Sequence, residues 1–270
     1  MTSPFAIDGP AVVSFSGGRT SAYMLRRILD EGLRPDVHVM FANTGKEREE
    51  TLEFVRACGE HWGVRIHWVE RALDANRATF REVDFETASR RGEPFEALLE
   101  QRRTLPGGGL RFCTTELKVR VMASWMRARG YDHWDMVIGI RADEPRRVAR
   151  LRAKPPEVWE HVLPLADAGV TVRDIDAFWR GQPFDLRLRP WEGNCDLCHL
   201  KSAAKLQRIM SERPELADWW IRMERRFRAQ FRRDAPSYAA LLDATRRQLR
   251  LFDSADLGDC LCHEGTTEAA

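Results

Sequence analysis

Apolar residues in the first half of the chain alternate between short extended runs and longer stretches with helical spacing. Four runs have the length of strands: Ala11–Phe15, Val37–Phe41, Arg65–Val69 and Met136–Ile140. Three stretches between them have the periodicity of amphipathic helices: Ser21–Asp30, Glu47–Trp62 and Thr114–Arg129. Strands separated by helices predict an α/β, Rossmann-like fold, a parallel sheet with helices on both faces.

The remaining segments are less regular or mostly helical. Residues 76–110 mix charges with a Pro-Gly-Gly-Gly run, which indicates an insertion or lid rather than an element of the sheet. Beyond Leu165, Thr171 and Ser202 are positioned to cap helices, and Pro214 suits the first turn of a long helix that reaches about Arg233. We therefore expect an α/β domain over residues 1–165 and a mostly helical region over residues 166–270.

Composition narrows the class of protein. The chain has 270 residues, of which 43% are hydrophobic and 31% charged, and its formal net charge is only +2. This balance is typical of a globular protein and argues against a polycation that binds nucleic acid over its whole surface. The sequence contains no apolar run long enough to span a bilayer and no signal peptide, which predicts a cytoplasmic protein without a membrane partner.

A loop rich in glycine and hydroxyl groups lies between the first strand and the first helix. Its sequence is Ser16-Gly17-Gly18-Arg19-Thr20-Ser21. The glycines allow the backbone to approach a phosphate, and the following helix presents unpaired N–H groups to the anion. A tight strand-to-helix turn without a ligand would also use two glycines. The spacing differs from that of a Walker A loop.

The segment SFSGGRTS resembles the PP-loop, SGGxxS, of the ATP pyrophosphatase and phosphoadenosine phosphosulfate (PAPS) reductase superfamily. Further segments in the same order are similar to other motifs of the PAPS reductase-like family: Asn43-Thr44-Gly45 with Glu50-Thr51, Gly139–Glu144 with Arg146 and Arg147, Pro164-Leu165, and Gly193–Cys198. Arg19-Thr20 and Asn43 depart from the family pattern, which has Lys-Asp and Asp there. These departures bear on the substrate rather than on the class of nucleotide.

The resemblance implies a HUP-type fold that binds ATP, PAPS or adenylyl sulfate, with Mg²⁺ as a candidate companion of the phosphates. The residues implied in nucleotide binding come from three loops: Ser16, Gly17, Gly18, Arg19, Thr20 and Ser21; Asn43, Thr44 and Gly45; Gly139, Arg141, Arg146 and Arg147. Arg141 is also expected to act in catalysis, since a cation stabilises charge that develops during such transfers.

Six cysteines provide the second candidate chemistry. Cys195-x-x-Cys198 has a spacing that lets two thiolates reach one metal, and the resemblance adds Cys113 to this site. Cys260 and Cys262 lie in a tail that loosely resembles the mobile E-C-G-L-H tail of the reductases, and they are candidate nucleophiles.

Three interpretations of the cysteines stay open. In the first, Cys113, Cys195 and Cys198 hold a [4Fe-4S] cluster, and the C-terminal pair, for example Cys262, supplies a fourth ligand or a sulfur-carrying thiol. In the second, Cys195, Cys198 and a C-terminal ligand, cysteine or His263, bind zinc. In the third, the thiols are simply buried. The spacing of Cys58 places it in the core.

Two enzymatic hypotheses and one binding hypothesis follow. The first is adenylation of an acceptor by ATP followed by sulfur transfer, with RNA or DNA as a candidate acceptor and a separate sulfur or thiol donor. The second is reduction of PAPS or adenylyl sulfate, and the third is a module that senses nucleotide or binds nucleic acid without turnover. Arginines and aromatic residues at 219–233 suit a polynucleotide, but an amphipathic helix with solvated arginines would have the same pattern, and we favour that interpretation.

Overall fold

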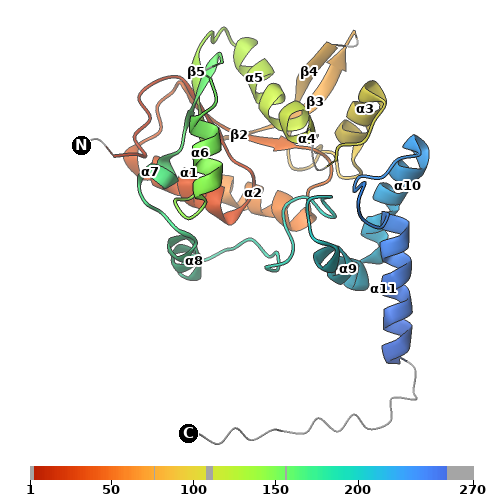
Figure 1. The fold of residues 1–270 in the computed structure, drawn as a ribbon. Helices are drawn as coiled ribbons and strands as arrows, with labels where there is room; N and C mark the ends of the chain where they lie inside the picture. The colour runs from red at the N-terminus through yellow and green to blue at the C-terminus, as the bar shows by residue number, and fades with distance from the viewer. Residues whose placement is uncertain (1–2, 76, 108–111, 156, 254–270) are drawn as a thin grey trace, which may run out of the picture.

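A single twisted sheet forms the centre of the molecule. The computed structural model describes residues 3–75, 77–107, 112–155 and 157–253, and Figure 1 shows the arrangement of its elements. The strands lie in the order β4-β3-β2-β1-β5-β6. Their bounds are Ala11–Ser14 (β1), Val37–Asn43 (β2), Ile66–Asp74 (β3), Arg77–Val83 (β4), Trp134–Ile138 (β5) and Trp159–Val162 (β6). All neighbouring strands are parallel except the β3–β4 pair. This confirms the expected Rossmann-like α/β fold.

Buried side chains of β1 and β2 alternate between the two faces of the sheet. Val13 and Phe41 pack into the cluster on one face, whereas Val12 and Met40 pack into the cluster on the other. Such two-sided burial explains why these strands are continuously apolar in the sequence.

Helices cover both faces. The first face packs against α1 (Arg19–Glu31), α2 (Glu49–Trp62) and α8 (Val172–Arg180), and the second packs against α5 (Arg120–Arg127). Short helices α6 (Pro145–Arg152) and α7 (Pro164–Asp167) flank β6 in the sequence. The predicted caps are present: Thr171 and Asp174 form a capping box, and the Ser202 hydroxyl accepts a hydrogen bond from Lys205 N.

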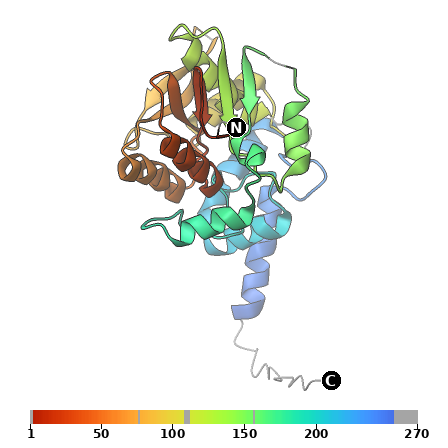
Figure 2. The ribbon, with the colours of Figure 1, turned by 90° about the vertical axis from the view of Figure 1, so that its left-hand side faces the viewer.

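A third apolar cluster belongs to a helical region beside the sheet, visible from two sides in Figures 1 and 2. It combines α3 (Glu93–Arg102) with α9 (Ala203–Glu212), the short 3-10 helix Pro214–Leu216, α10 (Ala217–Phe227) and α11 (Tyr238–Asp253). None of the described helices is both long enough and apolar enough to cross a lipid bilayer.

The structure corrects two expectations about elements. Part of the stretch expected to be an insertion or lid belongs to the sheet, because Arg77–Val83 forms β4, which pairs antiparallel with β3. This edge strand is partly exposed and carries charged residues, so its sequence lacks the apolar run by which the central strands were predicted. The long helix expected to reach Arg233 ends at Phe227, where Arg228 adopts a left-handed conformation with φ 50°.

The predicted helix at 114–129 also has an irregular start. A short turn, Phe112–Thr114 (α4), leads into a π-helical segment, Thr115–Val119, before α5. Widened π turns inside helices are often found at functional sites.

Candidate nucleotide and cysteine site

The PP-loop leaves β1 and enters α1 at the topological switch point of the sheet. The strand β1 lies between β2 and β5, so the crevice beyond its carboxyl end is the place where such folds bind ligands. Gly17 has φ 72°, and a Cβ there would lie 2.7 Å from Thr51 Cγ2 and 2.9 Å from Val55 Cγ2. Only glycine fits at this position, since both the backbone conformation and the neighbours exclude a side chain.

Hydroxyl groups fix the shape of this loop. The Ser21 hydroxyl accepts a hydrogen bond from Ser16 N (3.2 Å), contacts the Ser16 hydroxyl (2.9 Å) and donates to the Gly18 carbonyl (3.0 Å). Gly18 is the N-cap residue of α1, and no side chain caps the helix there. The first turn of a 13-residue helix therefore presents its N–H groups at the carboxyl edge of the sheet, a geometry suited to an anion.

Arg19 is held by the segment that follows α8. Its Nε donates to Asp185 Oδ1 at 2.7 Å, and its Nη2 contacts the second oxygen of the same carboxylate. The indole Nε1 of Trp179 donates to the Arg19 carbonyl at 3.0 Å. The two N–H groups with which an arginine can bind a phosphate are therefore bound to the Asp185 carboxylate in this structure.

The loop after β5 adjoins the PP-loop, as the motif order predicts. A Cβ on Gly139 would lie 3.2 Å from Ser21 Cα, so the two loops are in contact at this glycine. Arg141 Nη1 lies 3.3 Å from Thr20 Oγ1, and Asp143 orients the guanidinium through a 2.8 Å contact with Nε. Arg146 and Arg147 lie on the exposed surface of α6, where Arg147 pairs with Glu144.

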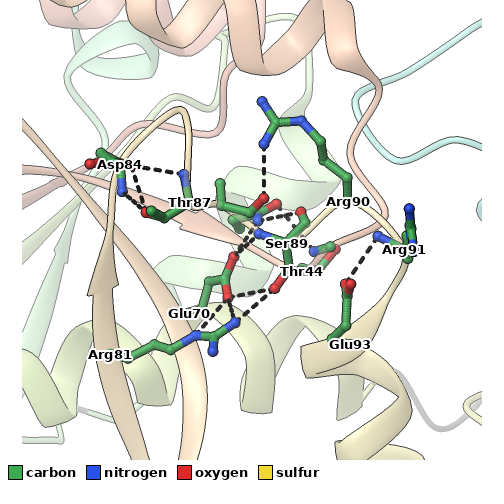
Figure 3. A network of polar contacts seen from close by, with 12 residues as sticks. Thr44, Glu70, Arg81, Asp84, Thr87, Ser89, Arg90, Arg91 and Glu93 are labelled. Atoms are coloured by element: carbon green, nitrogen blue, oxygen red, sulfur yellow. Dashed lines mark hydrogen bonds and ion pairs between the residues drawn. The ribbon is translucent and has the colours of Figure 1, made fainter.

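Asn43 occupies a buried polar network rather than an open surface. Its Nδ2 donates to Glu70 Oε1 (2.6 Å) and to the Ser89 carbonyl (2.8 Å), and its Oδ1 accepts from Gly45 N. Figure 3 shows Glu70 at the centre, where it also accepts hydrogen bonds from Ser89 and from Arg81. The network anchors the end of β2 to β3 and β4, and with it the loop that carries Thr44 and Gly45.

The cysteine segment is attached to that same loop. Glu47 and Cys195 form an antiparallel bridge, flanked by hydrogen bonds from Arg48 N to the Asn194 carbonyl (2.7 Å) and from Asp196 N to the Lys46 carbonyl (2.8 Å). Segments about 150 residues apart in the sequence are therefore joined as in a short two-stranded ribbon, next to the PP-loop.

The thiols of Cys195 and Cys198 are hydrogen-bonded to each other. A hydrogen bond from Cys195 lowers the pKa of Cys198 to about 6, while the pKa of Cys195 is raised well above its usual value by that same bond and by burial. Burial, followed by the charge of nearby Cys198, raises the pKa of Cys113. Cys113 thus lies within electrostatic reach of the pair, on the irregular turn before α5.

Lys118 carries a positive charge that interacts both with the cysteines and with the carboxylate of Glu47. Burial opposes its charge, but Glu47, Cys195 and Cys113 raise its pKa. Its ammonium lies 3.2 Å from Glu47 Oε1, while Glu47 Oε2 accepts from the backbone and the hydroxyl of Thr44 at 2.8 Å each. One buried carboxylate therefore links the loop after β2 to the cysteines.

The metal interpretation stays a prediction. Within residues 3–75, 77–107, 112–155 and 157–253, no three His, Cys, Asp or Glu side chains are arranged to hold a metal ion. As they stand, the three cysteines are neighbours that do not complete such a site. Cys260, Cys262 and His263 lie outside the described residues. Cys58 is a buried core thiol, and burial raises its pKa.

A hollow of about 420 Å³ opens beside the thiol pair. Its lining includes Asn194, Cys195 and Cys198 together with the ammonium-bearing side chains of Lys201 and Lys205. Lys201 also donates to the Cys195 carbonyl at 2.5 Å. The hollow combines nucleophilic sulfur with positive charge, a suitable environment for an anionic sulfur-containing group.

Sequence reasoning did not identify Glu47, Lys118, Asp185 or Asn194 as parts of this site. Asn194 stands inside the Gly193–Cys198 motif, but the motif does not reveal what its side chain contacts. The other three acquire their roles from long-range contacts, which spacing along the chain does not reveal.

The arginine-rich stretch 219–233 combines a buried face with paired charges. Trp219, Trp220 and Met223 are buried in the helical region, whereas Arg226 contacts Glu96 and Glu100 at 2.7 and 2.5 Å. These contacts support the interpretation of an amphipathic helix with solvated arginines.

Comparison with known proteins identifies the family. A family model described as the phosphoadenosine phosphosulfate reductase domain matches residues 10–167. An uncharacterized nin region protein of Escherichia phage lambda is 33% identical over 204 residues, which are 72% of this chain and 67% of the phage protein. An uncharacterized protein of Methanocaldococcus jannaschii is 42% identical over 60 residues, 22% of this chain and 12% of its own length. The matched residues include the PP-loop and the loops after β2 and β5. The chain belongs to the phosphoadenosine phosphosulfate reductase domain family.

Proposed function

We propose that this protein is an enzyme that binds ATP at the PP-loop, adenylates an acceptor and delivers sulfur to it from the adjoining cysteine site. The observation that carries this proposal is the attachment of the Cys195–Cys198 segment to the loop after β2, directly beside the PP-loop. An activated phosphate and a nucleophilic sulfur must be close for such a transfer.

The chemistry has two steps. An oxygen of the acceptor attacks the α-phosphorus of ATP, the bond between the α-phosphate and the bridging oxygen breaks, and pyrophosphate leaves. A hydrosulfide, supplied by a separate sulfur donor and held at the cysteine site, then attacks the adenylated carbon; the bond from that carbon to the AMP oxygen breaks, AMP leaves and the carbon keeps the sulfur. The N-terminus of α1 would bind the phosphates, with Mg²⁺ as their companion, and Arg141 beside Thr20 would stabilise charge on the leaving group.

The cysteines would supply the sulfur chemistry. The low pKa of Cys198 favours a thiolate at neutral pH, and thiolates are the reactive form of cysteine. Cys113, Cys195 and Cys198 remain the candidate ligands of an iron–sulfur cluster, with Cys262 as the proposed fourth. In the zinc alternative, Cys195 and Cys198 would bind the metal with the C-terminal residues and without Cys113. Metal, iron and sulfide analysis of anaerobically purified protein tests this assignment separately from the nucleotide site.

Reduction of PAPS or adenylyl sulfate is the second candidate, and the family to which the chain belongs favours it. There the thiolate of Cys260, Cys262 or Cys198 would attack the sulfonyl sulfur. The bond from sulfur to the 5′-phosphate oxygen would break, releasing AMP from adenylyl sulfate or adenosine 3′,5′-bisphosphate from PAPS. A thiol donor would then release sulfite while forming a disulfide with the cysteine. RNA or DNA enters only the first scheme, as an acceptor.

Two product assays separate the candidates. Release of pyrophosphate from ATP in the presence of acceptor supports adenylation, whereas release of sulfite from PAPS with a thiol donor supports reduction. A protein that binds nucleotide but gives neither product would be the sensing or nucleic-acid-binding module.

A further inference from the structure

Asn194 joins the PP-loop to the cysteine segment through its side chain and its backbone. Its Nδ2 donates to the Ser16 carbonyl at 2.5 Å, and its own carbonyl accepts from Arg48 N at 2.7 Å. Cys195 follows it directly in the chain. The residue therefore bonds both the PP-loop and the loop after β2, one position before the first cysteine of the pair.

The amide of Asn194 lies against the glycine at which α1 begins. A Cβ built on Gly18 would lie 3.3 Å from Asn194 Nδ2 and 3.6 Å from its Oδ1. An amide nitrogen carries two N–H groups, and the contact with Ser16 uses one of them. The second N–H of Asn194 lies at the edge of the PP-loop, beside the backbone N–H groups of α1 that suit an anion.

We propose that Asn194 completes the phosphate site from outside the PP-loop and couples occupancy of that site to the position of the Cys195–Cys198 segment. The inference rests on the proposed nucleotide function. A phosphate would accept a hydrogen bond from the second N–H of Asn194. This contact would favour the side-chain orientation in which the first N–H bonds the Ser16 carbonyl. Because the backbone of Asn194 is tied to Arg48, the same orientation stabilises the ribbon that holds Cys195.

The coupling follows from linkage. A ligand that binds more tightly when the ribbon is closed must itself favour the closed ribbon by the same free energy. The ribbon bonds and the Lys46–Asp196 ion pair already hold the cysteine segment. A bound nucleotide would add to this hold, so the thiols would be positioned most firmly when the phosphate site is occupied.

The test compares Asn194→Ala and Asn194→Asp with the native protein as purified, and uses Gln230→Ala as a control for an exposed amide far from the PP-loop. Calorimetry measures ATP and adenosine affinities, and hydrogen exchange follows the Arg48 and Asp196 amides with and without ATP. Both amides donate across the ribbon, so their exchange reports whether it is closed.

We expect Asn194→Ala to weaken ATP binding roughly ten- to hundredfold, the value of one hydrogen bond to a charged group. Asn194→Asp should weaken ATP binding further, through repulsion of phosphate, while adenosine affinity is unchanged in both variants. ATP should slow exchange of the two amides in the native and Gln230→Ala proteins but not in Asn194→Ala.

Equal ATP affinity in all four proteins, or an equal loss of ATP and adenosine affinity in the Asn194 variants, would overturn the inference. The second outcome would mean that Asn194 only supports the fold. Failure of the native protein to bind ATP or PAPS would instead overturn the proposed function, and the inference with it.

Discussion

Lys46 and Asp196 form a buried ion pair, with Nζ 2.7 Å from Oδ2, across the junction between the loop after β2 and the cysteine segment. Both side chains are less than one-tenth exposed. Trp220 Nε1 and Leu197 N donate to the other carboxylate oxygen at 2.9 and 2.5 Å, so the acid is fully bonded. The pair fixes the cysteines relative to the nucleotide loop.

We predict that Lys46→Met lowers the free energy of unfolding by about 3–5 kcal/mol, because Asp196 would be left as a buried, uncompensated charge. Denaturant unfolding measures the effect. Arg247→Met is the matched control, since its pair with Asp243 is exposed and contributes at most about 1 kcal/mol. Equal losses in the two variants would show that the buried pair has no special role.

The reactivity of Cys198 should follow its low pKa. In metal-free protein, we expect alkylation of Cys198 to rise with a midpoint near pH 6, and Cys195→Ala to move the midpoint upward because it removes the hydrogen bond that stabilises the thiolate. Mass spectrometry of the alkylated peptide identifies the residue. A midpoint near the ordinary value of 9.0 in both proteins would contradict the hydrogen-bonded pair.

The same shift predicts the pH dependence of stability. Between about pH 6 and 9.0, unfolded Cys198 binds a proton that the folded thiolate does not, so the free energy of unfolding should rise with pH across this window. The contribution is complete above 9.0 and is lost as pH falls through 6. Cys198→Ser should flatten this part of the profile.

Asn43→Asp restores the residue usual in the family but should destabilise this protein. The new carboxylate would lack the N–H groups that now bond Glu70 and Ser89, and it would face Glu70 at the present 2.6 Å contact. We expect a loss of about 1–3 kcal/mol at neutral pH, smaller at acid pH, where one carboxyl can be protonated. Thermal unfolding across pH checks both the loss and its direction.

The sequence was sufficient for the four central parallel strands and for the PP-loop, but not for the two edge strands β4 and β6. The continuous apolar strands β1 and β2 and the glycine pair have local signatures, because two-sided burial and the φ of Gly17 each restrict residue type at the position itself. The edge strand β4 was missed because only one of its faces is packed. Its charged residues therefore resemble those of a loop.

Other features required the fold. The role of Asn43 in nucleotide binding stays a prediction, and its hydrogen bond to Glu70 is a contact between strands that the sequence does not encode locally. The bond between Arg19 and Asp185 spans 166 positions. Such pairs depend on how the chain returns to the sheet, so a motif at either end does not reveal them.

The arginines of α10 and the loop after it should contribute little to nucleic-acid binding. Arg226 is already paired with Glu96 and Glu100, so we expect joint replacement of Arg225, Arg226 and Arg232 by alanine to leave polynucleotide affinity and its salt dependence unchanged. Filter binding over a range of salt concentrations measures both. A shallower salt slope in the triple variant would assign this surface to a polynucleotide instead.

The central claim is that the PP-loop binds the phosphates of an adenine nucleotide, and calorimetry of ATP and PAPS with the native protein and Gly18→Asp tests it most directly. The variant places a carboxylate at the start of α1, against Asn194, while the φ of −107° at this position is open to other residues. We predict measurable binding of at least one nucleotide to the native protein and its collapse in a variant that remains folded by circular dichroism. Unchanged affinity for both nucleotides in folded Gly18→Asp would contradict the account.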